Sequence, residues 1–591
     1  MKKLLFLSAA IMLCFAVAEF RPLSATAETP LCFNGIFGDN MILQRDKPVR
    51  IWGYGGREGE TVTVSFSGQT KTARIDADGW EVYLDPLPAD GEGQTLTAES
   101  EGERLEIENV AVGEVLFCSG QSNVAITVQY VINKYPEAVE EYRTYDNYAD
   151  IRLYTPVWGG KEEETIYTAP HSAWKQPSRI QDILYCSAFA SGLALNVQAK
   201  IGGNVPVGVI ETSTGGSCIE EWLSADTLSA LATHNASQSI YYNGMVSFLK
   251  GMTLNGVFWY QGEACIDYTE QYEEELAALI RQYRTDFANE DLPVYVMQLP
   301  QVNAMRAYGR AEAEEGWVKM RDVQQRISER FENVFTVCLA DTGDASDDSD
   351  CIHPADKWRV GERAANAFIA TALGTGDFSE GENPGISPKV ISAELLDGEI
   401  LLTTSSPVSS SDSVQGFSVK TSDGKVHSLV FSSEGRTLKA NFIGRAVSLN
   451  YLQTAAFSFS LLADDFGLPL MPVREMPVSD NRSMLEVTFW DGDVVIGSQH
   501  VKYGDCVQRT EPSKEGAVFN GWYADSVLSD SFDFSSPVTA DVAIYAKFTE
   551  LNSGEDSSGE ENSGCASVTS VISGIVAAAI LFWASFYKRQ D

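Results

Sequence analysis

The sequence predicts an α/β fold with three layers for the middle of the chain. Between residues 111 and 378, short apolar runs typical of buried strands alternate with longer segments that have helical apolar spacing. Alternation over about 250 residues predicts a parallel sheet, because parallel strands are joined by crossover helices. Polar segments follow several of these strands, at the edge where open α/β folds place their chemistry.

The expected elements follow one another in a regular order. Apolar runs predict strands, and apolar residues repeated at helical intervals predict helices. The expected strands are residues 115–118, 205–210, 256–258, 292–297 and 334–339, and the expected helices are residues 188–201, 272–287 and 318–331.

Both flanks of this domain are expected to be β-rich. Residues 30–110 contain alternating runs such as 61–66 and a hairpin turn at Asp78-Gly79, and they predict a small β-sandwich. The remaining segments are two further β-rich units at residues 388–478 and 486–549, and a polar, solvated linker at residues 550–564.

The two ends of the chain predict export and a membrane anchor. Residues 1–27 have a basic start, an apolar core and a small-residue cleavage pattern, which is typical of a signal peptide. Residues 565–587 carry no charge and are long enough to cross a bilayer as a helix. A Lys-Arg pair follows, as expected of a cytoplasmic tail. We therefore expect the body of the protein at the extracellular face of the cell membrane.

Composition narrows the classes of partner and cofactor. The chain has 591 residues and a formal net charge of −39, so it repels polyanions, and we expect no nucleic-acid partner. Its ten cysteines lack the paired spacing of zinc-binding motifs, so no zinc site is expected. No cofactor is expected either.

A candidate nucleophile follows the strand at residues 115–118. Gly120-Gln121-Ser122-Asn123 is predicted to form a tight turn in which the serine presents its hydroxyl at the edge of the sheet. A polar turn without chemistry is the simpler interpretation of these four residues. Residues 350–354 change that interpretation, because His353 offers a base and Asp350 an acid that can orient the base.

Two further polar segments follow strands. The paired glycines in residues 214–217 let backbone N–H groups approach an oxyanion, although a flexible turn is the alternative. After the strand at residues 256–258, Gln261 can donate an amide hydrogen bond to an oxyanion. Glu263 can orient a neighbour or accept from a substrate hydroxyl, and Trp259 either stacks on a sugar ring or fills the core.

In this order, these segments resemble the sialate O-acetylesterase family of the SGNH hydrolases. The likeness spans roughly residues 31–478 and rests on ordered motifs. The matching segments are residues 37–45, 112–123, 215–222, 259–263, 352–357 and 360–363.

The resemblance implies a three-layer, flavodoxin-like hydrolase domain that removes acetyl groups from sugar hydroxyls, especially those of O-acetylated sialic acids, without a metal. By position, it implies Ser122 as nucleophile and His353 as general base. It implies Asp350 as the orienting acid, with Asp341 or Asp344 as substitutes because family members vary here.

The resemblance also implies an oxyanion hole and a substrate-binding edge. The implied oxyanion donors are the Ser122 N–H, Gly216 and Gln261, and the candidates for substrate binding are Asn123, Glu263 and Trp259.

Three departures from the family pattern surround these positions. Val124 replaces the usual Met, Ser217-Cys218 stands where Thr-Arg is common, and Ala264-Cys265 replaces a polar pair. None of them changes the implied nucleophile or base. The cation lost at Cys218 leaves room for a neutral acetylated glycan such as xylan.

Residues 486–549 separately resemble the Listeria–Bacteroides repeat, a β-grasp-like module of bacterial surface proteins. Residues 519–523 and 545–548 carry that likeness. It implies a spacer, or contact with cell-surface or host glycans, rather than chemistry.

The expected function is therefore that of a carbohydrate O-acetylesterase, a carboxylic ester hydrolase that works through a serine acyl-enzyme. Two alternatives remain at this point. One is an acetylxylan-type esterase that acts on neutral plant glycans. The other is a catalytically inert adhesin that binds glycans at the cell surface.

Overall fold

The structure is a computed structural model that describes residues 29–156, 159–165, 173–231, 238–343, 352–374, 385–410, 414–454 and 460–551. The chain divides into two units. The first holds Met1–Leu485, His500–Cys506 and Ser535–Asp541, and the second holds the remaining C-terminal residues.

Two β-sheets form the N-terminal region, in agreement with the predicted sandwich-like segment. Aromatic pairs fill the core, for example Phe37 against Trp52, with ring centroids 4.8 Å apart. One sheet contains β1 (Cys32–Phe33), β3 (Val49–Tyr54) and β6 (Trp80–Leu84). The other contains β2 (Ile42–Gln44), β4 (Thr61–Phe66), β5 (Gln69–Arg74), β7 (Asp90–Ser100) and β8 (Glu103–Gly120).

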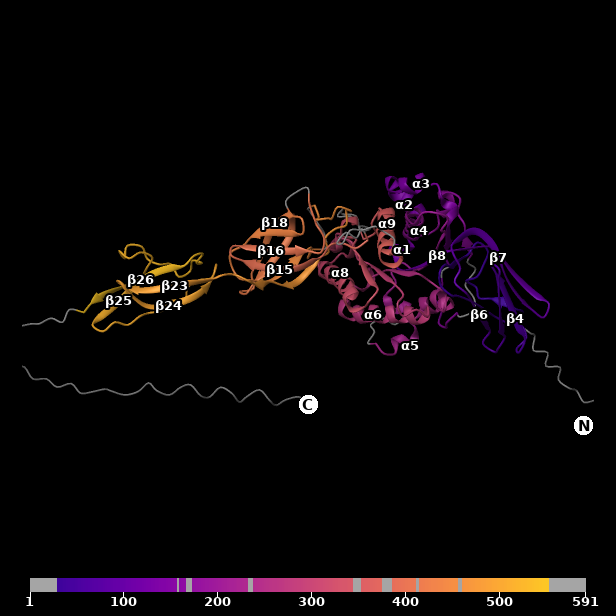
Figure 1. Ribbon diagram of the computed structural model, residues 1–591, viewed down its shortest axis with the longest axis horizontal. Helices are drawn as coiled ribbons and strands as arrows, with labels where there is room; N and C mark the ends of the chain where they lie inside the picture. The colour runs from indigo at the N-terminus through magenta and orange to yellow at the C-terminus, as the bar shows by residue number, and fades with distance from the viewer. Residues whose placement is uncertain are drawn as a thin grey trace, which may run out of the picture. The chain divides into compact units, whose positions relative to one another are not determined.

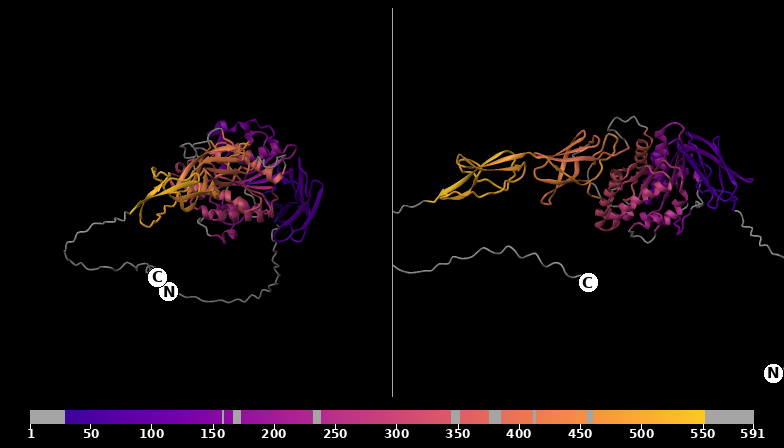
Figure 2. Two further views of the ribbon diagram at one scale, coloured as in Figure 1. Left: turned by 60° about the vertical axis from the view of Figure 1, so that its left-hand side comes forward. Right: turned by 60° about the horizontal axis from the view of Figure 1, so that its bottom comes forward.

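Strand β8 connects this region to the central domain. Its first half pairs antiparallel with β7, and its second half runs parallel to β11 (Val207–Ser213) and β12 (Gly256–Tyr260). The boundary predicted between residues 110 and 111 therefore lies inside a single strand. Figure 2 shows the indigo N-terminal strands beside the magenta central domain that β8 enters.

The central sheet is parallel except at one edge, as the sequence predicts. Its strand order is β10-β9-β11-β8-β12-β13-β14, and β10 is antiparallel to its neighbour. The strands not yet named are β9 (Ile151–Tyr154), β10 (Trp174–Lys175), β13 (Val294–Met297) and β14 (Val334–Val337).

Helices cover both faces of this sheet, which gives the predicted three layers (Figure 1). Phe117 on β8 is aligned with Val257 on β12, so Phe258 points to the opposite face. Phe117 packs on Phe287, which directly follows α6, whereas Phe258 packs on α9. The helices are α1 (Ser122–Ala125), α2 (Val128–Lys134), α3 (Glu140–Thr144), α4 (Ala188–Ile201), α5 (Ala225–Leu228), α6 (Thr269–Asp286), α7 (Ala304–Tyr308), α8 (Glu312–Arg330) and α9 (Lys357–Phe368).

The long helices agree with the predicted ones, except that α6 and α8 begin earlier than predicted. Helix α4 has the predicted bounds, and α6 begins three residues before the predicted start at residue 272. Helix α8 begins at Glu312 rather than residue 318. Its first turn is rich in glutamate, which suits the positive end of the helix dipole but carries no apolar spacing.

Helices α4 and α9 approach each other closely because glycines meet at their contact. A Cβ at Gly361 would lie 2.6 Å from the backbone carbon of Gly192, so neither position has room for a side chain. This contact places the start of α9 beside the turn that follows β8.

A second β-domain follows the central one, as predicted for residues 388–478. Its sheet has the order β21-β20-β17-β18-β19-β16-β15-β22, and its apolar core includes Cys338 and Ala340 of the central domain. The strands are β15 (Val390–Leu396), β16 (Glu399–Thr404), β17 (Val414–Thr421), β18 (Val426–Glu434), β19 (Thr437–Asn441), β20 (Ala446–Tyr451), β21 (Val473–Pro477) and β22 (Ser479–Asp480).

The C-terminal module is β-rich, as predicted. Its sheet has the order β24-β23-β26-β25, and residues 486–551 contain no helix. Trp522 packs on Phe489 in its core, with centroids 4.9 Å apart. The strands are β23 (Met484–Asp491), β24 (Val494–Lys502), β25 (Ala517–Tyr523) and β26 (Val542–Glu550).

The predicted signal peptide and the predicted membrane helix lie outside the described residues. Among the residues that are described, no helix has both the length and the apolar character needed to span a bilayer. The signal peptide, the polar linker and the C-terminal anchor stay predictions.

Candidate active site

The predicted turn after β8 is present and requires its glycine. Strand β8 ends at Gly120, whose φ of +149° suits glycine, and a Cβ there would lie 2.0 Å from the Tyr260 carbonyl oxygen. The Gln121 N–H donates to that same carbonyl at 3.1 Å. The turn is thereby fastened to the end of β12, and Ser122 begins α1 at the edge of the sheet.

Ser122 and His353, which are far apart in the sequence, are brought together at this edge. His353 Nε2 lies 2.8 Å from Ser122 Oγ. A neutral imidazole with its proton on Nδ1 can accept the serine proton at Nε2. This pair has the geometry that a nucleophile and its general base require.

Only one of the three candidate orienting acids lies within the described residues. Asp344 and Asp350 are outside them, so their roles stay predictions. Asp341 accepts hydrogen bonds from Arg359 Nη2 at 2.6 Å and from both terminal nitrogens of Arg363. Its carboxylate therefore holds the start of α9, which favours Asp350 or Asp344 as the partner of His353.

The glycine turn after β11 lies beside the nucleophile. The Thr214 N–H donates to the Gly120 carbonyl at 3.2 Å, and a Cβ added to Gly215 would be 3.7 Å from Ser122 Cβ. Gly216 has a φ of +74°, and a Cβ there would meet no atom of the described residues within 4 Å. The turn thus leaves open space close to Ser122, and the role of Gly216 as an oxyanion donor stays a prediction.

A buried network holds the residue next to the nucleophile. Asn123 Nδ2 donates to Glu263 Oε1 and, at 3.0 Å, to the Ile352 carbonyl, and Asn123 Oδ1 accepts from Lys357 Nζ. All three side chains are at most 1% exposed. The network ties α1, α9 and the loop after β12 together around Ser122.

Burial controls the charge of Glu263. Burial raises the pKa of Glu263 to about 7, against which the hydrogen bond from Asn123 and the charge of Lys357 act to lower it. Glu263 is thus poised between its charged and neutral forms near neutral pH.

Comparison with known proteins identifies the domain that carries this geometry. Residues 112–370 match a family model described as carbohydrate esterase, sialic acid-specific acetylesterase. The central domain is thus similar to this carbohydrate esterase family. Residues 486–547 match the Listeria-Bacteroides repeat domain.

Individual relatives agree with the family match. The chain is 27% identical over 379 residues to sialate O-acetylesterase from Homo sapiens, which covers 58% of this chain and 71% of the relative. It is 25% identical over 404 residues to the Mus musculus enzyme of the same name, with coverage of 58% and 73%. The crystal structure of a carbohydrate acetylesterase from Xanthomonas citri superposes with a TM-score of 0.65 and 25% identity, covering 75% of this chain and 99% of that one.

The side chain of Gln261 does not lie where an oxyanion donor should lie. Its amide nitrogen donates to the Ser217 carbonyl at 3.0 Å and lies 3.3 Å from Cys265 Sγ, and the side chain is fully buried. These contacts engage the amide hydrogens. Gln261 therefore joins the two loops behind the nucleophile, and the Ser122 N–H and Gly216 remain the candidate oxyanion donors.

The three candidate substrate-binding residues are also internal. Trp259 is fully buried, and its indole N–H donates to Tyr272 Oη at 3.2 Å. This position favours the core-filling alternative over stacking on a sugar. Asn123 and Glu263 bind each other, so in this structure both position the turn.

Sequence reasoning did not assign roles to Lys357 and Tyr308. Lys357 lies in one of the matched segments, but only the fold shows that it reaches Asn123. Tyr308 Oη donates to the Glu263 carbonyl at 2.7 Å. No spacing signal connects these residues to Ser122, because each comes from a different loop or helix.

Proposed function

We propose that this protein is an exported carbohydrate O-acetylesterase that acts on O-acetylated sialic acids. The observation that carries the chemistry is the 2.8 Å contact between Ser122 Oγ and His353 Nε2 at the edge of the central sheet. The esterase family of residues 112–370 supports the class of substrate.

The reaction has two halves. Ser122 Oγ attacks the acetyl carbonyl while His353 takes its proton, and the N–H groups of Ser122 and Gly216 are the proposed donors to the oxyanion. Collapse of the tetrahedral intermediate releases the sugar hydroxyl, which receives the proton from His353. Water, deprotonated by His353, then cleaves the acetyl-serine ester and releases acetate.

The geometry favours esterase activity over an inert adhesin. An adhesin has no need of a histidine aligned on a serine, whereas the Asn123 network holds this serine in place. A fluorophosphonate probe labels an activated serine, so labelling that is lost in Ser122→Ala supports the esterase.

One observation favours a neutral glycan as a second candidate substrate. Cys218 occupies the position where arginine is common in the family, and its thiol lies beside Cys265 and Glu220 rather than supplying a cation. Acetylated xylan should therefore be assayed in the same way as the sialoside.

Export and anchoring form a separate part of the proposal. Three features support a place at the extracellular face of the membrane: the basic and apolar start of the chain, the uncharged stretch at residues 565–587 and the surface-type repeat at residues 486–547.

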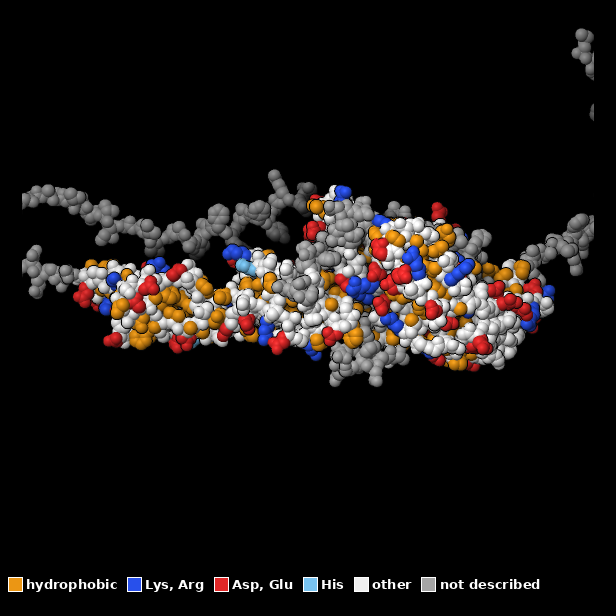
Figure 3. Space-filling view, turned by 90° about the horizontal axis from the view of Figure 1, so that it is seen from above, with side chains coloured by type: hydrophobic (Ala, Val, Ile, Leu, Met, Phe, Trp, Pro, Cys, Tyr) orange, Lys and Arg blue, Asp and Glu red, His pale blue; other side chains and the backbone are white. Residues whose placement is uncertain are grey.

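On the face seen in Figure 3, acidic and basic side chains of the described residues are interspersed rather than gathered into a basic stripe.

The deciding experiment measures acetate release by the purified protein from a 9-O-acetylated sialoside and from acetylated xylan. Ser122→Ala should lower the rate by at least about 10³-fold, whereas the exposed Ser229→Ala should not change it. An unchanged rate in Ser122→Ala would falsify the assignment of the nucleophile. Activity on acetylated xylan alone would make xylan the substrate instead of the sialoside.

A further inference from the structure

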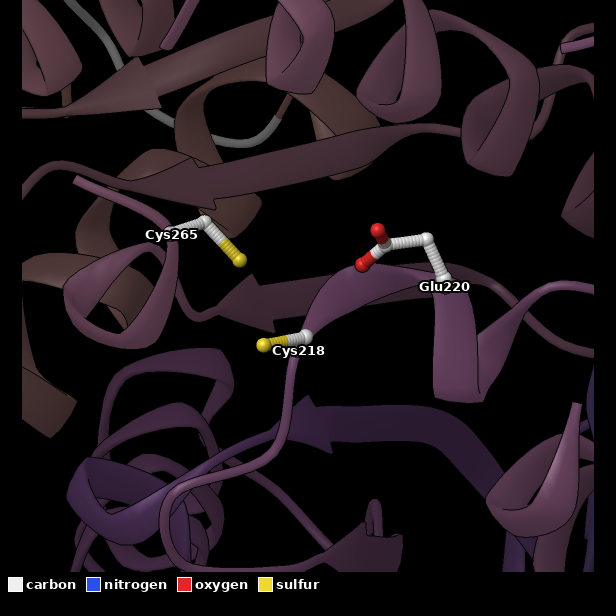
Figure 4. A group of neighbouring side chains, drawn as sticks. All are labelled: Cys218, Glu220 and Cys265. Carbon is white, nitrogen blue, oxygen red and sulfur yellow. The ribbon is translucent and has the colours of Figure 1, made fainter. Parts of the chain in front are cut away.

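Two cysteines that depart from the family pattern are neighbours in the fold. Cys218 follows β11 and Cys265 follows β12, and the sequence gives no sign that they meet. The Sγ atoms of both residues and a carboxylate oxygen of Glu220 all lie within 4.8 Å of one another. Figure 4 shows the three side chains grouped around one space between their loops.

The surroundings of this group are buried and acidic. Glu220 and Cys265 are fully buried, and so is Glu275 on α6, whose carboxyl shares a hydrogen bond with that of Glu220. The charged groups that act on Cys218 and Glu275 are acids, namely Glu220, Glu221 and Cys218 itself. Burying two carboxyls together is unfavourable unless protons or a cation neutralise them.

The donor atoms suit one class of cation. Thiolate sulfur with carboxylate oxygen is the ligand chemistry of zinc, which binds sulfur at about 2.3 Å and oxygen at about 2.0 Å in a tetrahedron. Ligand atoms on such a tetrahedron are roughly 3.5 Å apart, so side chains already within 4.8 Å need only a small contraction. Calcium and magnesium, which prefer oxygen, are excluded by the two sulfurs.

We propose that Cys218, Cys265 and Glu220 bind a zinc ion, and that Glu275, whose carboxyl is hydrogen-bonded to that of Glu220, moves in as the fourth ligand. The two thiols release their protons to solvent on binding, and the ion supplies the positive charge that the buried acids require. Gln261 Nε2 lies 3.3 Å from Cys265 Sγ, where it can donate to the thiolate.

The position of this zinc site indicates a structural role. Four protein ligands, three of them fully buried, leave no open position for substrate. The site joins the loop that carries Gly216 to the loop that carries Glu263, so the ion would hold together two segments that flank Ser122. It is separate from the Ser122–His353 pair, and its test does not depend on esterase activity.

Metal analysis of the full-length protein, purified without chelator, tests the site directly. We expect one zinc per chain and an X-ray absorption spectrum with two sulfur neighbours at about 2.3 Å. Absence of zinc from a folded protein with both thiols reduced would overturn the proposal. So would an intact mass lower by two hydrogen atoms before reduction, because that result shows a Cys218–Cys265 disulfide instead.

Variants separate this site from adventitious zinc. Cys218→Ser and Glu220→Gln should each weaken zinc binding by about 100-fold or more, whereas Cys506→Ser, at an exposed cysteine, should bind as the wild type does. Chelator should lower the melting temperature of the wild type and of Cys506→Ser, and leave that of Cys218→Ser unchanged. Zinc retained at full stoichiometry in Cys218→Ser would overturn the assignment.

Discussion

The central domain holds two groups of buried or partly buried acids, and they are neutralised in different ways. On the side of α9, Asp341 is held by Arg359 and Arg363, and Glu263 is connected through Asn123 to Lys357. On the side of α6, Glu220 and Glu275 are buried against each other and two thiols.

The two groups of acids therefore support the site in different ways. Where a cation is built into the fold, the acid has a fixed partner, and Ser122 and His353 gain fixed supports. Where the neighbours are acids, the protein needs protons or a bound ion to bury the same charge. The catalytic side is thus preorganised by the chain itself, whereas the other side requires protons or a bound ion.

The largest expected effect tests which acid acts on His353. Asp350→Asn should lower kcat by about 10³- to 10⁴-fold, because the wrong imidazole tautomer is then favoured. Asp341→Asn should leave the kcat of the folded protein within a few-fold of the wild type but lower the free energy of unfolding by about 3 kcal/mol, since Arg363 is buried. Steady-state kinetics and urea unfolding of both variants measure these effects.

The opposite pattern would assign the two acids the other way round. If Asp341→Asn loses activity while Asp350→Asn keeps it, then Asp341 orients His353 at some stage of the reaction and the α9 side is not merely a support.

The next effect removes the cation on the catalytic side. Lys357→Met keeps a buried side chain of similar length but leaves the Asn123 oxygen without its donor, and it removes a charge that lowers the pKa of Glu263. We expect the free energy of unfolding to fall by about 3 kcal/mol, with a loss of kcat. Lys319→Met, at a partly exposed lysine paired with Glu315, is the matched control and should change stability by less than about 1 kcal/mol. Equal effects in the two variants would show that Lys357 does not support the turn.

The third prediction concerns pH. Burial raises the pKa of Glu263 from 4.5 to about 7, so between these values the folded protein keeps a proton that the unfolded chain has released. Stability therefore falls as pH rises through this window, by about 3 kcal/mol in all for this group. Glu263→Gln stays neutral and keeps an oxygen for Asn123, so it should gain stability relative to the wild type as pH rises.

Urea unfolding at several pH values checks this prediction. The difference in unfolding free energy between Glu263→Gln and the wild type should change by about 3 kcal/mol between about pH 4.5 and pH 8. The exposed Glu270→Gln should show no such trend, and a flat difference for Glu263→Gln would mean that Lys357 keeps Glu263 ionised throughout.

Local sequence signals predicted the parts of the site that depend on single elements. The strand before Ser122, helix α4 and the pairing of Ser122 with His353 all follow from apolar runs, spacing and motif order. The domain boundary near residue 110 could not be predicted this way, because β8 continues through it with apolar residues that suit both sheets.

Contacts between loops that are distant in the sequence could not be predicted from it. Gln261 has the chemistry of an oxyanion donor, but its amide turns to Ser217 and Cys265 because those loops pack behind the nucleophile. Cys218 and Cys265 lack the close spacing of a zinc motif, since their proximity comes from the loops that follow β11 and β12, the two strands on either side of β8.

The smallest effect concerns the backbone of Glu263. Tyr308 Oη donates to the Glu263 carbonyl at 2.7 Å, and burial raises the pKa of Tyr308, so the hydroxyl remains a donor at neutral pH. Tyr308→Phe should lower the free energy of unfolding by about 1 kcal/mol, with kcat/KM reduced less than about tenfold. The exposed Tyr185→Phe should change neither quantity. If Tyr308→Phe instead loses activity as Lys357→Met does, without losing stability, then the hydroxyl contacts the substrate rather than only supporting the Glu263 backbone.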